Sequence, residues 1–340
     1  MIIVLKPKIS KRDESAVLME IRKLGYKPHV MRGVARTVIG AIGDELTHKS
    51  LEALATQFPK FVESVTPIQK RFQLVSRQAH TANSTVKIRN GLVIGGKKFH
   101  VMAGPCSVES ERQLMKTAEA VSKAGATILR GGAFKPRTSP YEFQGLGEKG
   151  LKLLAKARRE TGLAVITEML SEQHADLVAE YTDIIQIGAR NSQNFQLLIA
   201  AAKTGKPVLL KRGLSMKVEE WLLAGEYVLA NENPNLMFCE RGIRTFETYT
   251  RNTLDLSTIP IIKQESHCPI VIDPSQGTGR ADLVTSLCKG AVAMGADALL
   301  IEVHPNPAEA WSDGAQQVTL EQFSKLMQEL RPLVLAAGRG

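Results

Sequence analysis

The sequence predicts an α/β protein in which a (β/α)₈ TIM barrel follows a small ferredoxin-like α+β domain. Two observations carry this prediction. From residue 99 onward, short apolar segments alternate with amphipathic segments of helical period, as in a barrel of parallel strands. Residues 1–67 show the order strand, helix, two strands, helix and strand. A chain of 340 residues accommodates a barrel of about 250 residues and one small additional domain.

The first predicted domain spans residues 1–67. Ser10 stands three residues before Asp13, in capping-box register, and is expected to begin the first helix. Gly25 is expected to end that helix, and Pro59 to end a second one. Four strands are predicted at 2–5, 28–31, 37–42 and 62–66.

A linker and a β-hairpin are predicted between this domain and the barrel. Residues 68–85 are polar and lack a periodic pattern, so we assign them to the linker. The barrel domain, 86–340, is expected to begin with a hairpin because Asn90-Gly91 is a strong two-residue turn signal between apolar stretches. Such a hairpin is suited to close the N-terminal end of the barrel.

The barrel elements follow one another in regular alternation. Eight strands are predicted at 100–103, 127–130, 164–168, 184–188, 207–211, 236–240, 270–273 and 298–302. Helices are predicted after most of them, at 110–124, 147–161, 194–204, 217–229, 280–294 and 319–335. A doubly wound sheet is the competing architecture, but no glycine-rich GxGxxG turn follows the first strand.

Composition, net charge and the cysteines exclude several classes of protein. No apolar run approaches the length of a membrane span, and the N-terminus lacks the pattern of a signal peptide, so a cytoplasmic protein without membrane partners is expected. The formal net charge is +10, but the basic residues are dispersed, which argues against nucleic acid as a partner. The four cysteines form no CxxC pair, so no disulfide framework is expected.

Cations gather where the predicted strands end, which is the end of a TIM barrel that carries the active site. Their mutual repulsion would be strong unless anions filled the space between them. Because arginine forks suit phosphate and carboxylate oxygens, we infer small, multiply anionic substrates. The alternative is that these cations pair with Glu168, Glu240 and Asp273, which we expect for only one or two of them. The four cations at strand ends are Arg130, Arg190, Lys211 and Arg241.

Motifs at these strand ends resemble those of 3-deoxy-D-arabino-heptulosonate 7-phosphate (DAHP) synthases. The similarity extends over nearly the whole chain and is greatest to the type I branch with an N-terminal ferredoxin-like regulatory domain. A KPRT segment at 135–138 separates it from the sister synthase of 3-deoxy-octulosonate 8-phosphate, which uses arabinose 5-phosphate. The motifs are AGPCS at 103–107, LRGGAFKPRTSP at 129–140, FQGLG at 143–147, IGARN at 187–191, LKRG at 210–213 and CERGIRTF at 239–246.

The resemblance implies condensation of phosphoenolpyruvate with D-erythrose 4-phosphate and water, giving DAHP and phosphate. This reaction is the first step of the shikimate pathway, which leads to the aromatic amino acids. The resemblance assigns the phosphoenolpyruvate subsite to Arg130, Arg190, Lys211 and Arg241. It assigns the erythrose 4-phosphate subsite to Lys135, Arg137 and Thr138, and we add Asp273 as a substrate-binding residue. The predicted catalytic residues are Lys135, Glu168 and Lys211.

The family also binds one divalent metal ion, Mn, Fe, Zn or Co, through Cys, His, Glu and Asp side chains. Cys106, Glu302 and Asp313 match three of these ligands, but Gln276 stands where the histidine is expected after Asp-Pro-Ser. An amide oxygen is a weaker ligand than imidazole, so we predict Gln276 as a fourth ligand of a weakened site. Two other outcomes stay open, namely compensation by a nearby histidine, His304 or His267, and impaired or metal-independent catalysis.

Two alternative functions follow from the same residues. One is a sister phosphoenolpyruvate-dependent synthase that takes another phosphorylated aldose. The other is a low-activity or regulatory homologue, which only Gln276 supports. The resemblance further implies inhibition by tyrosine or phenylalanine through the N-terminal domain, and a homotetramer. The alternative is that this domain only assists assembly.

Overall fold

The computed structural model describes residues 1–7, 9–33, 36–43, 48–66 and 71–340. The chain divides into two compact units, Met1–Ala82 and Asn83–Gly340. The predicted domain end at residue 67 and the first linker residues, 68–70, lie outside the described residues, so the predicted linker boundaries stay a prediction. In the described part of the chain, no helix is long and apolar enough to cross a membrane.

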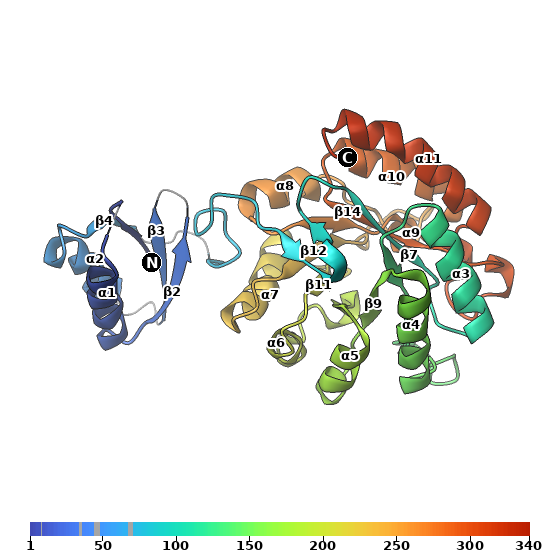
Figure 1. The fold of residues 1–340 in the computed structure, drawn as a ribbon, viewed down its shortest axis with the longest axis horizontal. Helices are drawn as coiled ribbons and strands as arrows, with labels where there is room; N and C mark the ends of the chain where they lie inside the picture. Colours follow the sequence, from blue (N-terminus) through green and yellow to red (C-terminus); the bar gives the residue numbers. More distant parts are fainter. Residues whose placement is uncertain (8, 34–35, 44–47, 67–70) are drawn as a thin grey trace. The chain divides into compact units, whose positions relative to one another are not determined.

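The first unit is a ferredoxin-like α+β fold, as predicted (Figure 1). Its sheet is antiparallel with the strand order β2-β3-β1-β4, so the first strand lies in the interior of the sheet. The elements are β1 (Ile2–Leu5), α1 (Lys11–Lys23), β2 (Lys27–Arg32), β3 (Thr37–Ile42), α2 (His48–Gln57) and β4 (Val62–Thr66).

Local sequence signals explain the first helix and how it packs. The Ser10 side chain accepts a hydrogen bond from the Asp13 amide and so caps the exposed N–H groups of α1. Gly25 follows the helix with a φ of 85°, a conformation that glycine adopts without steric cost. Val17 and Ile21 stand one turn apart on the buried face and join the core of this unit. The predicted cap and stop signals are therefore both confirmed.

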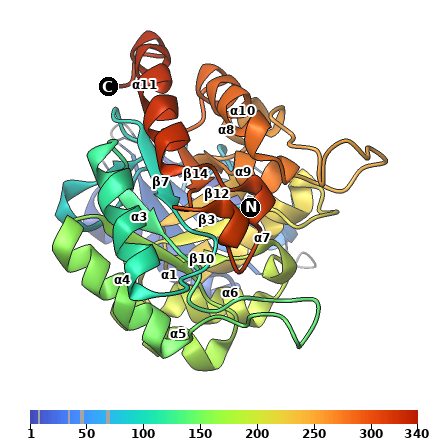
Figure 2. The same ribbon diagram turned by 90° about the vertical axis from the view of Figure 1, so that its right-hand side faces the viewer.

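The second unit is a closed barrel of eight parallel strands with helices around it (Figure 2). Each strand lies within one residue of its predicted bounds. The strands are β7 (His100–Gly104), β8 (Ile128–Arg130), β9 (Ala164–Glu168), β10 (Ile184–Ile187), β11 (Val208–Lys211), β12 (Leu236–Glu240), β13 (Ile270–Ile272) and β14 (Ala298–Glu302).

All six helices predicted for the barrel are present within one residue of their predicted bounds. They are α3 (Glu111–Lys123), α4 (Glu148–Thr161), α6 (Phe195–Lys203), α7 (Val218–Ala230), α10 (Ala281–Ala293) and α11 (Leu320–Ala336). Sequence analysis missed three shorter helices, which are α5 (Ala175–Tyr181), α8 (Thr258–Glu265) and α9 (Pro274–Thr278). None of these exceeds eight residues, so each has too few turns to establish a helical period.

The predicted hairpin closes the N-terminal end of the barrel. Strands β5 (Val86–Lys87) and β6 (Val93–Ile94) pair antiparallel, and the turn between them places Asn90 and Gly91 at positive φ. The Val86 and Ile94 side chains are fully buried and join the core cluster inside the barrel. That cluster includes the residues that begin four barrel strands, which are Ile128, Ala164, Ile184 and Ala298.

Truncating the hairpin should destabilise the barrel measurably. Ile94→Ala removes a fully buried side chain and leaves a cavity, so the free energy of unfolding should fall by about 2–5 kcal/mol. Lys87→Ala, at an exposed position of the same hairpin, should change it by less than about 0.5 kcal/mol. Denaturant unfolding followed by Trp fluorescence measures both, and equal effects of the two changes would contradict the closing role of the hairpin.

Candidate active site

A polar cavity of about 380 Å³ lies at the C-terminal ends of the barrel strands. Arg130, Glu168 and Lys211 are the last residues of β8, β9 and β11, and the other charged side chains come from the loops that follow strands. The cavity is lined by eight cationic side chains but only three carboxylates. The cations are Arg130, Lys135, Arg137, Arg190, Lys211, Arg241, Arg244 and Arg251.

The structure brings the predicted site residues together. Ten of them line the cavity directly, and these are Arg130, Lys135, Arg137, Thr138, Glu168, Arg190, Lys211, Arg241, Gln276 and Asp313. The remaining three bond to the cations that do. Cys106 Sγ accepts a hydrogen bond from Lys135 Nζ at 3.1 Å. Asp273 accepts one from Lys211, and Glu302 accepts one from Arg130.

Two of the cavity cations form deeply buried ion pairs. Arg130 Nη1 lies 2.7 Å from Glu302 Oε1, and Lys211 Nζ lies 2.6 Å from Asp273 Oδ2. All four side chains are at most 5% exposed, so each carboxylate neutralises a charge that could not otherwise stay inside the barrel. Burial opposes the charge of Arg130, but Glu302, Cys106 and Asp273 together outweigh burial and raise the pKa of Arg130. These two cations are held rigidly at the base of the cavity.

Three other cavity cations lack a carboxylate partner in the part of the chain that the structure describes. Among the described residues, Arg190, Arg241 and Arg244 have no carboxylate within ion-pair distance. Arg190 donates only to the Pro136 carbonyl at 3.4 Å. Burial lowers the pKa of Arg241, which marks it as a cation without a full counter-charge. The expectation that only one or two of the strand-end cations pair with carboxylates therefore holds, since Asp273 pairs with Lys211.

Glu240, which sequence analysis considered as a partner for these cations, is engaged behind the cavity instead. It pairs with Arg212 at 3.0 Å, and Arg212 also pairs with Asp255 at 2.9 Å. The second oxygen of Glu240 accepts from the Gly242 amide at 2.6 Å. These bonds fix the loop after β12, which carries Arg241 into the cavity.

Lys135 occupies a confined position beside Cys106. Its Nζ lies 3.1 Å from Cys106 Sγ and 3.2 Å from the Cys106 carbonyl oxygen, and the side chain is 8% exposed. A Cβ at position 132 would lie 2.7 Å from Lys135 Cδ, which is closer than van der Waals contact allows. Glycine at position 132 therefore leaves room for the Lys135 side chain. Burial opposes its charge, but Cys106 and nearby carboxylates outweigh burial and raise the pKa of Lys135. Lys135 is therefore an ammonium group at neutral pH.

Sequence analysis gave no role to several residues that line the cavity. Arg244 belongs to the CERGIRTF motif. The motif indicated that this residue lies near the site, but not that its side chain points into the cavity. Arg251 and Asn252 come from the same long loop, ten residues beyond Arg241, where no periodic pattern predicts position. Gln186 reaches the cavity from the interior of β10, where it donates to Glu168 at 3.4 Å.

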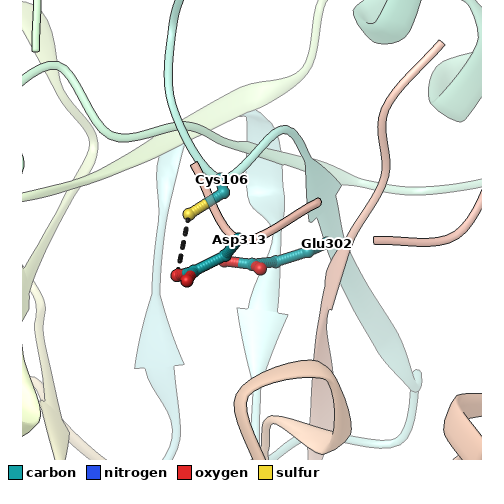
Figure 3. Close-up of side chains that lie close together, drawn as sticks. All are labelled: Cys106, Glu302 and Asp313. Atoms are coloured by element: carbon teal, nitrogen blue, oxygen red, sulfur yellow. Dashed lines mark hydrogen bonds between the residues drawn. The ribbon is translucent and has the colours of Figure 1, made fainter. Parts of the chain in front are cut away.

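Three potential metal ligands converge at one side of the cavity. Cys106, Glu302 and Asp313 each offer one ligand atom, and these atoms lie within 4.8 Å of one another (Figure 3). A thiol and two carboxylates make a mixed donor set that suits a divalent transition metal. Burial opposes the charge of Asp313, but Lys135 and Arg251 lower its pKa to about 2, so it is a carboxylate at neutral pH. Burial raises the pKa of the Cys106 thiol to about 11, and the negative charge of Glu302 adds to this effect.

Gln276 lies beside this cluster with its amide nitrogen toward it. Its Nε2 donates to Glu302 Oε1 at 3.1 Å and to Asp313 Oδ2 at 3.2 Å. Its Oε1 accepts from Arg241 Nη2 at 3.0 Å. Gln276 thus connects the possible metal site to a cation of the predicted phosphoenolpyruvate subsite.

The two histidines considered as replacement ligands lie elsewhere. His304 Nε2 bonds to Glu109 at 3.1 Å, and its Nδ1 accepts from the Asn306 amide at 3.0 Å, so both ring nitrogens are engaged. His267 precedes β13 at the N-terminal end of the barrel, where its Nδ1 bonds to Ser84. Neither histidine belongs to the group of potential ligands that converges at Cys106.

Comparison with known proteins agrees with this fold and site. The model of the DAHP synthetase I family matches residues 76–336, and the model of the DAHP synthase ferredoxin-like domain matches residues 1–70. The chain belongs to the DAHP synthetase I family. A phospho-2-dehydro-3-deoxyheptonate aldolase of Thermotoga maritima is 48% identical over 340 residues, which cover 99% of each chain.

Solved structures and a second group of relatives refine the comparison. The crystal structure of the DAHP synthase of Thermotoga maritima covers 99% of this chain and 98% of its own, with a TM-score of 0.79 at 48% identity. A truncated form of a synthase from that organism covers 79% of this chain and 98% of its own, with a TM-score of 0.74. A 2-dehydro-3-deoxyphosphooctonate aldolase of Caulobacter vibrioides is 34% identical over 255 residues, which cover 69% of this chain and 87% of the relative.

Breaking a buried ion pair at the base of the cavity should destabilise the barrel strongly. Lys211→Met leaves Asp273 charged and unpaired in the interior, so the free energy of unfolding should fall by about 3–5 kcal/mol. Lys152→Met removes a solvent-exposed lysine that pairs with Glu148, and should leave the free energy of unfolding almost unchanged because water screens that pair. Chemical denaturation compares the two, and a Lys211→Met protein as stable as Lys152→Met would show that the buried pair is dispensable.

Proposed function

We propose that this protein condenses phosphoenolpyruvate with D-erythrose 4-phosphate and water to give DAHP and inorganic phosphate, the first step of the shikimate pathway. The observation that carries the proposal is a barrel cavity lined by eight cations, in a chain that is 48% identical to a named synthase along its whole length. Two phosphorylated substrates supply the negative charge that such a cavity requires.

The phosphoenolpyruvate subsite is assigned to four cations of the cavity. Arg130 and Lys211, fixed by Glu302 and Asp273, are preorganised to bind the carboxylate and phosphate without moving. Arg190 and Arg241 lack carboxylate partners and are available for bidentate contacts with anionic oxygens. The four are Arg130, Arg190, Lys211 and Arg241.

The erythrose 4-phosphate subsite is assigned to the loop after β8. Arg137 and Thr138 lie toward the cavity mouth and suit the phosphate, whereas Lys135 is buried and suits the aldehyde end. Arg137 pairs with Glu142 through two bonds of 2.7 and 3.2 Å, so substrate phosphate would compete with that carboxylate for the guanidinium.

The chemistry then follows from the position of each group. The methylene carbon of phosphoenolpyruvate forms a bond to the aldehyde carbon, and the ammonium of Lys135 donates a proton to the developing alkoxide. Water, oriented by Glu168, adds to the second carbon of phosphoenolpyruvate, and its oxygen becomes the ketone oxygen as phosphate leaves with the bridging oxygen. One proton of that water restores the Lys135 ammonium, and the other leaves with the phosphate. Glu168 is buried at the end of β9, where a side chain at Gly188 would collide with its carboxylate. Glycine at position 188 therefore keeps space for this carboxylate.

We assign one divalent metal ion, Mn, Fe, Zn or Co, to Cys106, Glu302 and Asp313, with Gln276 at the edge of the site. When bound there, the ion would polarise the aldehyde carbonyl as a Lewis acid. Lys135 Nζ lies 3.1 Å from Cys106 Sγ, so the proton donor and the cation site share one wall of the cavity. The Lys135 ammonium is therefore available to the aldehyde oxygen whether or not the ion is present.

Two alternative functions have weaker support. A sister synthase for a different phosphorylated aldose is favoured by the Caulobacter relative, but that match covers only 69% of this chain, against 99% for the Thermotoga relative. A low-activity or regulatory homologue is favoured only by Gln276. The assigned substrate cations are all present in the cavity, which argues for a working enzyme.

Lys135 and Arg137 should affect different kinetic constants. Lys135→Met removes the proton donor to the aldehyde oxygen, so kcat should fall by about 10²–10⁴-fold. Arg137→Ala removes a contact with a distant phosphate and should chiefly raise the KM for erythrose 4-phosphate. Steady-state rates of phosphate release measure both variants, with circular dichroism to verify folding. A Lys135→Met enzyme with unchanged kcat would exclude this lysine as the proton donor.

Regulation and assembly are proposed on the basis of the N-terminal domain. We assign to it feedback inhibition by tyrosine or phenylalanine, and we assign a homotetramer to the whole protein. The match of residues 1–70 to the ferredoxin-like domain of DAHP synthases supports the proposed inhibition. Because the proposed substrates are phosphorylated and do not cross membranes freely, we also propose a cytoplasmic location.

Removing the N-terminal unit should separate inhibition from catalysis. A protein that begins at Asn83 retains every residue assigned to the cavity, so it should keep activity and lose inhibition by either aromatic amino acid. The assay is phosphate release with increasing tyrosine or phenylalanine, with the full-length protein as control. Undiminished inhibition of the shortened protein would place the effector site in the barrel.

A further inference from the structure

Gln276 is oriented by the chemistry of its three partners. Glu302 and Asp313 are carboxylates that can only accept hydrogen bonds, and Arg241 can only donate one. The amide nitrogen must therefore face the two acids, at 3.1 and 3.2 Å, and the amide oxygen must face the guanidinium, at 3.0 Å. In this arrangement the only lone pairs of the Gln276 side chain are directed at Arg241 and not at the cluster.

The three potential ligands also have cationic partners within the protein. Arg130 lies 2.7 Å from Glu302, and Arg251 lies 3.2 Å from Asp313, so the two carboxylates are matched by two guanidinium groups. The Lys135 ammonium lies 3.1 Å from Cys106 Sγ. The charges of the two carboxylates are therefore balanced by protein groups alone.

We propose that Gln276 is a hydrogen-bonding clamp and not a metal ligand. It joins Glu302 to Asp313 and holds Arg241 against them, so the site stays assembled without a metal ion. A divalent cation then has three protein ligands, Cys106, Glu302 and Asp313, and must compete with the amide N–H groups for both carboxylates. This inference rests on the cation site assigned under the proposed function and gives that site a low affinity.

Two substitutions at this position separate a clamp from a ligand. Gln276→Met keeps the length of the side chain but removes its donors and its acceptor. Gln276→His places an imidazole beside the three ligands. Gln316→Met is the matched control, because Gln316 also donates to Glu302, at 2.6 Å, but contacts neither Asp313 nor Arg241.

The probe is Co²⁺ added to full-length protein stripped of metal, followed by the thiolate charge-transfer absorption of Cys106. We expect Gln276→His to bind Co²⁺ at least about tenfold more tightly than wild type. Gln276→Met and Gln316→Met should bind it no more weakly than wild type, and at most about threefold more tightly, because each removes N–H donors that compete for the carboxylates. A tenfold gain confined to Gln276→His would support the clamp, because it would show that position 276 lacks a ligand in the natural side chain.

Thermal unfolding in excess chelator tests the clamp without any metal. Gln276→Met should unfold roughly 2–6 °C below wild type, because the buried Glu302, the partly exposed Asp313 and Arg241 each lose a hydrogen-bond partner. Equal melting temperatures in chelator would overturn the proposal. So would Co²⁺ binding that is at least tenfold weaker in Gln276→Met, since that result would identify the amide oxygen as a ligand.

A Cys106→Ser variant separates this proposal from the proposed function. Loss of the charge-transfer band in Cys106→Ser would place the cation at the assigned site. An unchanged band would remove the cation site from the proposed function, and the melting temperatures in chelator would still decide whether Gln276 holds the cluster together.

Discussion

Positive charge held inside the barrel is the constraint on which the rest of the site depends. Arg130 and Lys211 stand at the ends of β8 and β11 and are almost inaccessible to solvent. They are tolerated there because Glu302 and Asp273 lie directly beside them. Among the described residues, Arg190, Arg241 and Arg244 have no carboxylate within ion-pair distance, so a ligand must supply the negative charge that neutralises them. Small anionic substrates are the natural consequence of this arrangement.

Gln276 links this charged cavity to the cluster of Cys106, Glu302 and Asp313. Glu302 accepts hydrogen bonds from both Arg130 and Gln276, and Gln276 accepts from Arg241. A substitution at any one of these side chains therefore changes the hydrogen bonds of the others. The same contacts explain how the acids can stay close together in the absence of a metal ion, and why binding of an ion would require them to exchange partners.

Much of the architecture could be predicted because the barrel strands are buried on both faces and read as short apolar runs. The strand ends were placed within one residue, which was enough to bring the correct loops to one rim. Short helices such as α5 and α9 escaped prediction because they contain too few residues to display a period. The hairpin was visible because Asn90-Gly91 demands a backbone that few other residue pairs adopt.

Side-chain direction is what the sequence could not supply. Arg251 joins the cavity from a long loop without periodicity, and its pairing with Asp313 depends on how that loop folds. Glu240 ends a strand like Glu168, yet it turns to Arg212 and the Gly242 amide behind the cavity. The identity of Gln276 was plain in the sequence, but the direction of its amide is set by Arg241 after β12, by Glu302 at the end of β14 and by Asp313 in the segment that follows β14.

The central claim is that this cavity joins phosphoenolpyruvate to erythrose 4-phosphate. The most direct measurement is to incubate the purified full-length protein with both substrates and identify the product by mass spectrometry while phosphate is quantified. The account predicts one phosphate released for each seven-carbon DAHP formed. Absence of any condensation product, or an eight-carbon product formed preferentially when arabinose 5-phosphate competes with erythrose 4-phosphate, would contradict it.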